Sequence, residues 1–296
     1  MATHNVSNVT QLNTALGVAV SGDDIVMAAG TYDLTDGVIN LPDGVNLSGA
    51  SSTTTTIVTT STINDGAGNG CCIKPGSGSV IRDLGVVLDP SPLDLRACIG
   101  VDRGAATPQA YFTTASAVRC LFDGGSDSVY MNAATDASPT ACRMQFSNCT
   151  IKSRWDSYMG RAPSATLWNK IVDFYNCTIQ SLAHADTSTN SAIVALAGTV
   201  RLFKCTVQST CDTASTAARA LFASTSGSSS GRIFAHASTL TSTHNGAGNA
   251  RDAWQNSSGA LFLRECTYSR AKLTGVVRTG AWRRSGASRT RRRSTV

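Results

Sequence analysis

One short phrase, a cysteine followed in most copies by threonine, recurs through the chain from residue 119 onward and limits what this sequence can fold into. Successive copies of the phrase are 29, 28, 28 and 61 residues apart, and Ser238 takes the place of a cysteine inside the long gap, dividing it into 33 and 28. A fixed period of this size indicates stacked structural repeats. The residues that follow each cysteine favour a short strand over a helical turn. We therefore predict a coil of parallel strands that climbs one strand width per turn. The repeated cysteines are Cys120, Cys149, Cys177, Cys205 and Cys266.

The repeated cysteines also indicate their own environment. At the same position of successive coils they would lie about 4.8 Å apart with parallel Cβ directions, slightly beyond the usual Cβ separation of a disulfide. We expect them to be buried, free thiols in an inward ladder. The remaining five cysteines lie off this ladder, and their spacing does not determine their state: Cys71, Cys72, Cys98, Cys142 and Cys211.

The positive charge of the chain belongs to its C-terminal end. The net charge is +6 at pH 7, from 25 basic and 19 acidic residues. Nine of the basic residues follow Glu265, so the rest of the chain carries 16 basic against 19 acidic residues. Residues 269–296 are predicted to be an Arg-rich, disordered tail. The tail is either a non-specific anchor for nucleic acid or acidic surfaces or an uncapped or artefactual end. No motif for specific nucleic-acid recognition accompanies it.

Residues 1–22 are predicted to form an N-terminal cap. Asn8 and Gln11 have the spacing of a helix N-cap and capping box, and an apolar face follows. A short amphipathic helix there would cover the open end of the first coil. The N-terminus shows no apolar signal-peptide core, and no run of 18 apolar residues predicts a membrane span. A virion or extracellular surface is the location that we favour.

The segments after this helix resemble a known superfamily. Gly22-Asp23-Asp24-Ile25, Gly30-Thr31-Tyr32 and Leu41-Pro42-Asp43-Gly44 are similar to the opening of pectin-lyase-like proteins. The resemblance implies an all-β fold, a single-stranded right-handed parallel β-helix with an N-terminal capping α-helix, over residues 23–268. The superfamily includes polysaccharide lyases, glycoside hydrolases, epimerases, adhesins and phage tailspikes, so the resemblance says little about activity.

Candidate chemistry lies seven residues after the ladder cysteines, at Asp127, Asp156 and His184. If the register holds, two carboxylates lie one coil apart, with a histidine on the next coil. Their repulsion would raise one pKa, as a glycosidase acid requires. Alternatively, they would hold Ca²⁺ in a lyase, with Arg154 or Arg161 as the base. A structural alternative is that the aspartates cap turns.

Aromatic residues near the two aspartates are candidate sugar platforms, since apolar ring faces pack on pyranose faces. Those closest in sequence are Tyr130, Trp155 and Tyr158. The alternative is that they pack in the core.

Two functional hypotheses follow. The first is a non-catalytic β-helix on a virion or cell surface that binds an extended polysaccharide, as in tailspike and adhesin shafts, which are usually homotrimers. The second is a polysaccharide lyase or glycoside hydrolase acting through Asp127 and Asp156, with Ca²⁺ as a cofactor in the lyase case. The catalytic signatures of polygalacturonases and pectate lyases are absent from the sequence, which favours the first hypothesis.

Overall fold

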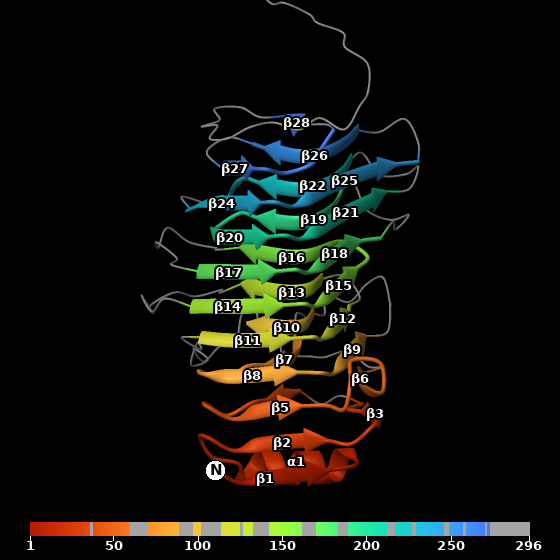
Figure 1. The fold of residues 1–296 in the computed structure, drawn as a ribbon, viewed down its shortest axis with the longest axis vertical. Helices are drawn as coiled ribbons and strands as arrows, with labels where there is room; N and C mark the ends of the chain where they lie inside the picture. Colours follow the sequence, from red (N-terminus) through yellow and green to blue (C-terminus); the bar gives the residue numbers. More distant parts are fainter. Residues whose placement is uncertain are drawn as a thin grey trace, which may run out of the picture.

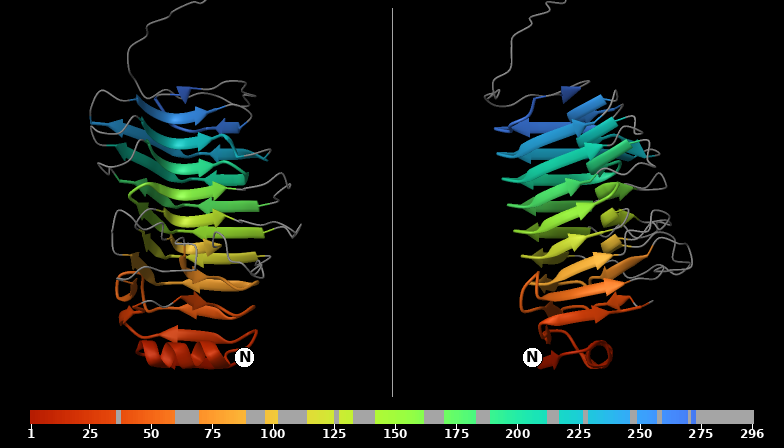
Figure 2. Two further views of the ribbon diagram at one scale, coloured as in Figure 1. Left: turned by 180° about the vertical axis from the view of Figure 1, so that it is seen from behind. Right: turned by 90° about the vertical axis from the view of Figure 1, so that its right-hand side faces the viewer.

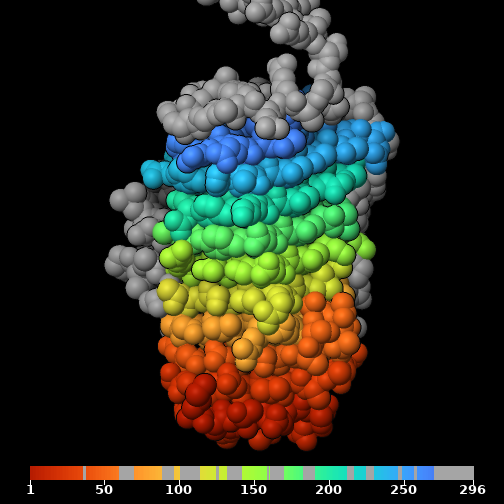
Figure 3. Space-filling model, in the orientation of Figure 1, coloured from red at the N-terminus to blue at the C-terminus, as the bar shows by residue number. Residues whose placement is uncertain are grey.

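The strands of this chain form three sheets that run along a single stack, with one helix at the N-terminal end (Figure 1). The computed structural model describes residues 1–35, 38–59, 70–88, 97–101, 114–124, 127–132, 142–161, 170–182, 189–211, 217–226, 229–245, 249–256, 259–269 and 271–272. Along most of the chain each turn adds one strand to each sheet, and nearly all pairs are parallel. The predicted all-β right-handed parallel β-helix is confirmed, and its coils appear as stacked bands in Figure 3.

We name the three sheets A, B and C in the order in which the chain visits them. Sheet A contains β1 (Thr3–Val6), β2 (Asp24–Met27), β5 (Asn46–Ser48), β8 (Ser79–Arg82), β11 (Thr114–Val118), β14 (Cys142–Ser147), β17 (Lys170–Tyr175), β20 (Gly198–Phe203), β23 (Thr225–Ser226), β24 (Ser229–His236) and β27 (Ala260–Arg264). Sheet B contains β3 (Gly30–Asp33), β6 (Thr55–Thr59), β9 (Gly85–Leu88), β12 (Leu121–Asp123), β15 (Thr150–Ser153), β18 (Thr178–Ser181), β21 (Thr206–Cys211) and β25 (Thr239–His244). Sheet C contains β4 (Ile39–Asn40), β7 (Cys71–Lys74), β10 (Ala97–Val101), β13 (Asp127–Asn132), β16 (Asp156–Arg161), β19 (Thr189–Ala195), β22 (Ala217–Ala223), β26 (Asn249–Gln255) and β28 (Ala271–Lys272).

The turn from sheet A to sheet B is a bend at one residue in the left-handed region. The bend residues have φ between 49° and 57°, which costs free energy for any residue with a Cβ and is best tolerated by asparagine and aspartate. Each bend residue directly precedes a position of the cysteine ladder or Leu84. The repeated phrase therefore encodes a corner as well as a strand. The bend residues are Asp83, Arg119, Asn148, Asn176, Lys204, Ala237 and Glu265.

The cysteine ladder lies just inside this corner. All ten cysteines of the chain are free and buried, which confirms the expected free thiols of the ladder. The Cys177 Sγ–H donates to the Tyr175 carbonyl oxygen at 3.4 Å, and in the serine copy the Ser238 Oγ–H donates to the His236 carbonyl oxygen at 2.9 Å. The side chain thus satisfies a carbonyl two residues back, across the bend. Cysteine and serine are both small and can both donate here, so serine can replace cysteine at this position.

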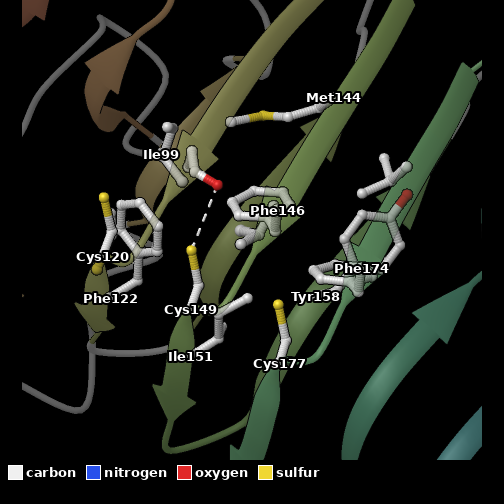
Figure 4. Close-up of a cluster of buried hydrophobic side chains, with 14 of the residues drawn as sticks. Ile99, Cys120, Phe122, Met144, Phe146, Cys149, Ile151, Tyr158, Phe174 and Cys177 are labelled. Atoms are coloured by element: carbon white, nitrogen blue, oxygen red, sulfur yellow. Dashed lines mark hydrogen bonds between the residues drawn. The ribbon is translucent and has the colours of Figure 1, made fainter. Parts of the chain in front are cut away.

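Aromatic rings fill the middle of the stack beside the ladder (Figure 4). Phe146 and Phe174 stack with ring centroids 5.0 Å apart and an interplanar angle of 13°. Phe122 from sheet B meets Phe146 edge-on at 5.9 Å. Buried rings of this kind remove a large apolar area from water between these coils.

The helix α1 (Val9–Val18) covers the first coil, as predicted (Figure 2). Asn8 accepts a hydrogen bond from the Gln11 backbone N–H at 2.9 Å, while the Gln11 side chain accepts from the Ser7 backbone N–H at 2.8 Å. Leu12 is fully buried against the core. The sequence analysis did not predict β1, which precedes the helix and pairs with β2. No helix in the described ranges is long and apolar enough to span a membrane.

Asp23 joins the helix to the first strands. Its carboxylate accepts backbone hydrogen bonds from Ala2 at 2.6 Å and Val20 at 3.1 Å, and lies 3.3 Å from His4 Nε2. The two backbone donors lower the pKa of Asp23 to about 2. At the other end of the stack, pairing continues to β28, and residues 273–296 of the predicted tail lie outside the described residues.

Candidate functional site

The outer face of sheet C brings the two predicted acidic residues together. Asp127 in β13 and Asp156 in β16 are register partners on neighbouring parallel strands, as predicted from their equal offset from the ladder cysteines. Their Cα atoms are therefore about 4.8 Å apart. On the next strand, the partner of Asp156 is Ser191 and not a histidine. His184 lies outside the described residues.

The two carboxylates differ in exposure. Asp127 is 5% exposed, whereas Asp156 is half-buried. One oxygen of Asp156 accepts a hydrogen bond from the Ser191 backbone N–H at 3.1 Å. This bond ties Asp156 to the next coil within the sheet. The catalytic roles of both aspartates remain predictions.

Arg154 and Trp155 lie at the corner between sheets B and C, directly before Asp156. Both side chains are half-buried, and the Trp155 carbonyl oxygen accepts a hydrogen bond from the Ser181 Oγ–H. The corner therefore fixes the backbone from which Asp156 projects. It places the predicted base and one predicted sugar platform on either side of the same turn.

The two predicted tyrosine platforms lie on opposite sides of sheet C. Tyr130 packs with Cys71 and Ala97 in a small cluster separate from the main core and is 7% exposed. Tyr158 is 1% exposed, lies in the main core, and meets Phe174 edge-on at 6.0 Å. Tyr158 therefore packs inside the coil, where it cannot contact a glycan bound on the surface, and we leave it out of the site.

The register of sheet C continues the acidic column into basic residues that the sequence analysis did not identify. Ser191 pairs with Arg219 in β22, and Arg219 pairs with Arg251 in β26. A neighbouring column carries the aromatic rings Phe222 and Trp254, which are also register partners. The sequence carried a signal for this pairing. In both strands an arginine follows an alanine and lies three positions before the aromatic residue.

The guanidinium groups lie over the aromatic rings. The Arg219 Cζ is 4.2 Å from the centroid of the Phe222 ring and 4.0 Å from that of Trp254, and the Arg251 Cζ is 5.1 Å from the Trp254 centroid. These are cation–π distances. Burial lowers the pKa of Arg219 to about 10, with a smaller opposing effect from the carboxylate of Asp156.

The outer face of sheet A carries a second set of polar and aromatic columns. Asp173 is fully buried there and accepts hydrogen bonds from Arg143 on the preceding coil, with the closest contact at 2.6 Å, and from Arg201 on the following coil at 2.5 Å. Tyr175 is half-buried and stacks on Phe203 with ring centroids 4.9 Å apart. The carboxylate of Asp173 is thus paired with two arginines of the protein itself.

The residues of the acidic pair do not fit a calcium cage. Ca²⁺ takes six to eight oxygen ligands, and within the part of the chain that the structure describes no group of three or more His, Cys, Asp or Glu side chains could hold a metal ion. Asp127 and Asp156 provide two carboxylates in this column. No step of the proposal below uses Ca²⁺.

Comparisons with known proteins find similarity at the level of structure. No family model and no curated protein matches this sequence. A tailspike protein of Acinetobacter baumannii bacteriophage Fri1, a capsular polysaccharide depolymerase, aligns with a TM-score of 0.54 and 12% identity over 94% of this chain and 51% of the tailspike. This chain thus spans about half the length of that protein.

Two enzymes align less closely. Pectin methylesterase from carrot gives a TM-score of 0.47 and 14% identity over 91% of this chain and 83% of the esterase. Alginate lyase from Paenibacillus sp. str. FPU-7 gives a TM-score of 0.40 and 12% identity over 94% of this chain and 98% of the lyase. At these identities a structural likeness concerns architecture and not activity. Together with the three sheets described above, the likeness to the tailspike shows that this chain has a right-handed parallel β-helix fold.

Proposed function

We propose that this protein is a surface-exposed β-helix that binds an extended polysaccharide along the outer face of sheet C, as a receptor-binding component of a virion or an adhesin. The observation that carries the proposal is the pair of adjacent columns on that face. One column runs from Asp127 to Arg251 and offers charged and hydrogen-bonding groups, while the other includes Tyr130 and Trp254.

Adjacent polar and aromatic columns suit a sugar polymer. A pyranose has an apolar ring face and a rim of hydroxyl groups, so it is held by an aromatic surface flanked by hydrogen-bonding side chains. Parallel strands repeat these groups about every 4.8 Å along the stack. A linear chain lying along the stack would thus meet comparable groups at successive coils.

The comparison with the phage tailspike supports the same proposal, since that protein is a capsular polysaccharide depolymerase with a similar fold. A homotrimer is part of the proposal by analogy with shafts of this kind. The Arg-rich tail would add at most non-specific contact with nucleic acid.

A catalytic function is the second candidate, and the register pairing of Asp127 with Asp156 favours it. Retaining glycosidases hold two carboxyl groups about 5–5.5 Å apart, close to one strand spacing. In this alternative one carboxyl protonates the leaving oxygen and the other attacks the sugar. In the lyase version Arg154 removes the proton next to the uronate carboxyl.

The two candidates are separated by incubating the protein with hyaluronan, alginate and dextran, with and without Ca²⁺, and measuring both binding and products. The proposal predicts binding without new reducing ends or unsaturated uronate. Product that disappears in Asp156→Asn but persists in Asp123→Asn, a carboxylate on sheet B, would establish the catalytic alternative. Absence of binding to every polysaccharide would contradict the proposal.

A further inference from the structure

Arg219 and Arg251 on sheet C form a positively charged pair of register partners. Both side chains are half-buried, and each has a buried Nε–H with no hydrogen-bond acceptor. Among the described residues neither guanidinium forms an ion pair, and their contacts are those with Phe222 and Trp254. A charge that is removed from water without a partner is costly. An anion that binds here would therefore gain a large electrostatic free energy.

The two arginines are held in a geometry suited to an anionic group that is attached to a sugar ring. They are register partners, so their backbones are about 4.8 Å apart. Stacking on Trp254 orients the guanidinium planes and limits their rotation, which reduces the entropy lost when an anion binds. A planar guanidinium then offers two parallel donors to a carboxylate or sulfate.

The rest of the column restricts where the negative charge of a ligand can be. Towards the N-terminal end the arginines are followed by Ser191 and then by Asp156 and Asp127, about 10 and 14 Å from Arg219 at one strand spacing per step. A polymer with a charge on every unit, such as a polyuronate or a nucleic acid, would place anions against these carboxylates. A polymer with neutral units between its charges would place fewer anions there.

We infer that Arg219, Arg251 and Trp254 form a subsite for an acidic sugar, bearing a carboxylate or a sulfate, within a heteropolysaccharide that also contains neutral units. The inference rests on the proposed polysaccharide binding and specifies its chemistry. The acidic group would lie between the two guanidinium groups, and the neutral units would extend over Ser191 towards Asp156.

The subsite can be tested without a polymer. In a ¹⁵N-labelled sample, the Nε–H signals of Arg219 and Arg251, assigned with Arg219→Lys and Arg251→Lys, should shift on addition of glucuronate or glucose 6-sulfate and not of glucose. A comparison of the two anions shows whether the subsite prefers a carboxylate or a sulfate. Equal responses to glucose, or no response to either anion, would overturn the subsite.

Polymers then test the spacing of charge. Hyaluronan, in which glucuronate alternates with N-acetylglucosamine, should bind more tightly than polyguluronate or single-stranded DNA at the same salt concentration. Arg219→Gln/Arg251→Gln should weaken hyaluronan binding by about tenfold or more, and Arg232→Gln on sheet A should not. Tighter binding of polyguluronate or DNA would overturn the inference. If the monosaccharide anions shift the arginine signals but no polysaccharide binds, the subsite stands and the proposed function fails.

Discussion

At the scale of the residue, the repeat is a device for turning the corner between sheets A and B. A left-handed bend residue is followed by a small donor that satisfies a carbonyl across the bend, as Cys177 and Ser238 both do. The period predicted the ladder, and the residues after each cysteine predicted a strand, but the residue before each cysteine was given no conformation. Its left-handed conformation was not predictable from the period, because arginine, lysine, alanine and glutamate occupy it as well as asparagine.

The ladder thiols should be unreactive in the folded protein. Burial and hydrogen bonds along the ladder raise the pKa of Cys149 and of Cys177 to about 12, so at pH 8 almost none of either thiol is ionised. A thiolate-specific reagent should therefore label both residues only as fast as the chain unfolds. Labelling of Cys149 or Cys177 well before loss of the circular-dichroism signal would show that the ladder does not face inward.

The bend residues provide a stability prediction. Ala237 has φ of 49° and is exposed, so it gains nothing from its methyl group while carrying the left-handed strain. Ala237→Asn should stabilise the protein by about 0.5–1 kcal/mol, and the matched change Asn176→Ala should destabilise it by a similar amount. Urea unfolding of the two variants checks this. If the two variants changed the free energy of unfolding equally and in the same direction, the bend would not be the cause.

At the scale of the element, buried charges hold neighbouring coils together. Asp173 on β17 bridges Arg143 on β14 and Arg201 on β20. Arg143→Ala or Arg201→Ala alone leaves one partner and should cost about 1 kcal/mol. The double variant leaves a buried carboxylate unpaired and should cost about 3–5 kcal/mol.

The exposed pair Arg119 and Asp83 is the control for this cycle, because the Arg119 side chain is 58% exposed. Its removal should cost much less stability than the loss of both arginines around Asp173, because solvent screens an exposed ion pair. If the double variant lost only the sum of the stability losses of the two single variants, the bridging role of Asp173 would be contradicted. Denaturant unfolding of the single and double variants measures the coupling.

The N-terminal cap should respond to acid. The pKa of Asp23 is lowered from 3.8 to about 2 by its backbone donors, so its carboxylate stabilises the folded cap above pH 4. That contribution is lost as the pH falls from about 4 through 2, because the unfolded chain takes up the proton first. His4 and the N-terminal amine also lie near this carboxylate.

Hydrogen exchange of β1 and α1 between pH 5 and pH 2 measures this loss, with amide rates corrected for their intrinsic dependence on pH. Protection should fall in the native protein, whereas Asp23→Asn should be less protected throughout and change little. An unchanged protection in the native protein down to pH 2 would contradict the role of Asp23.

At the scale of the whole molecule, stacking converts a sequence offset into a spatial column. This is why the register of Asp127 and Asp156 was predictable from the ladder alone. The direction of Tyr158 was not, because Ser157 and Tyr158 are both buried at the corner and the simple alternation of a strand is interrupted there. Arg219 and Arg251 escaped the prediction because they follow their ladder positions, Cys205 and Ser238, by 14 and 13 residues instead of seven.

The central claim is that a polysaccharide lies along sheet C, and side-chain footprinting with hydroxyl radicals tests it most directly. With bound hyaluronan, oxidation of Phe222 and Trp254 on sheet C should fall, while oxidation of Phe234 and Phe262, which stack on sheet A with centroids 4.4 Å apart, should not change. Protection of the sheet A pair with sheet C unchanged, while hyaluronan remains bound, would contradict the account.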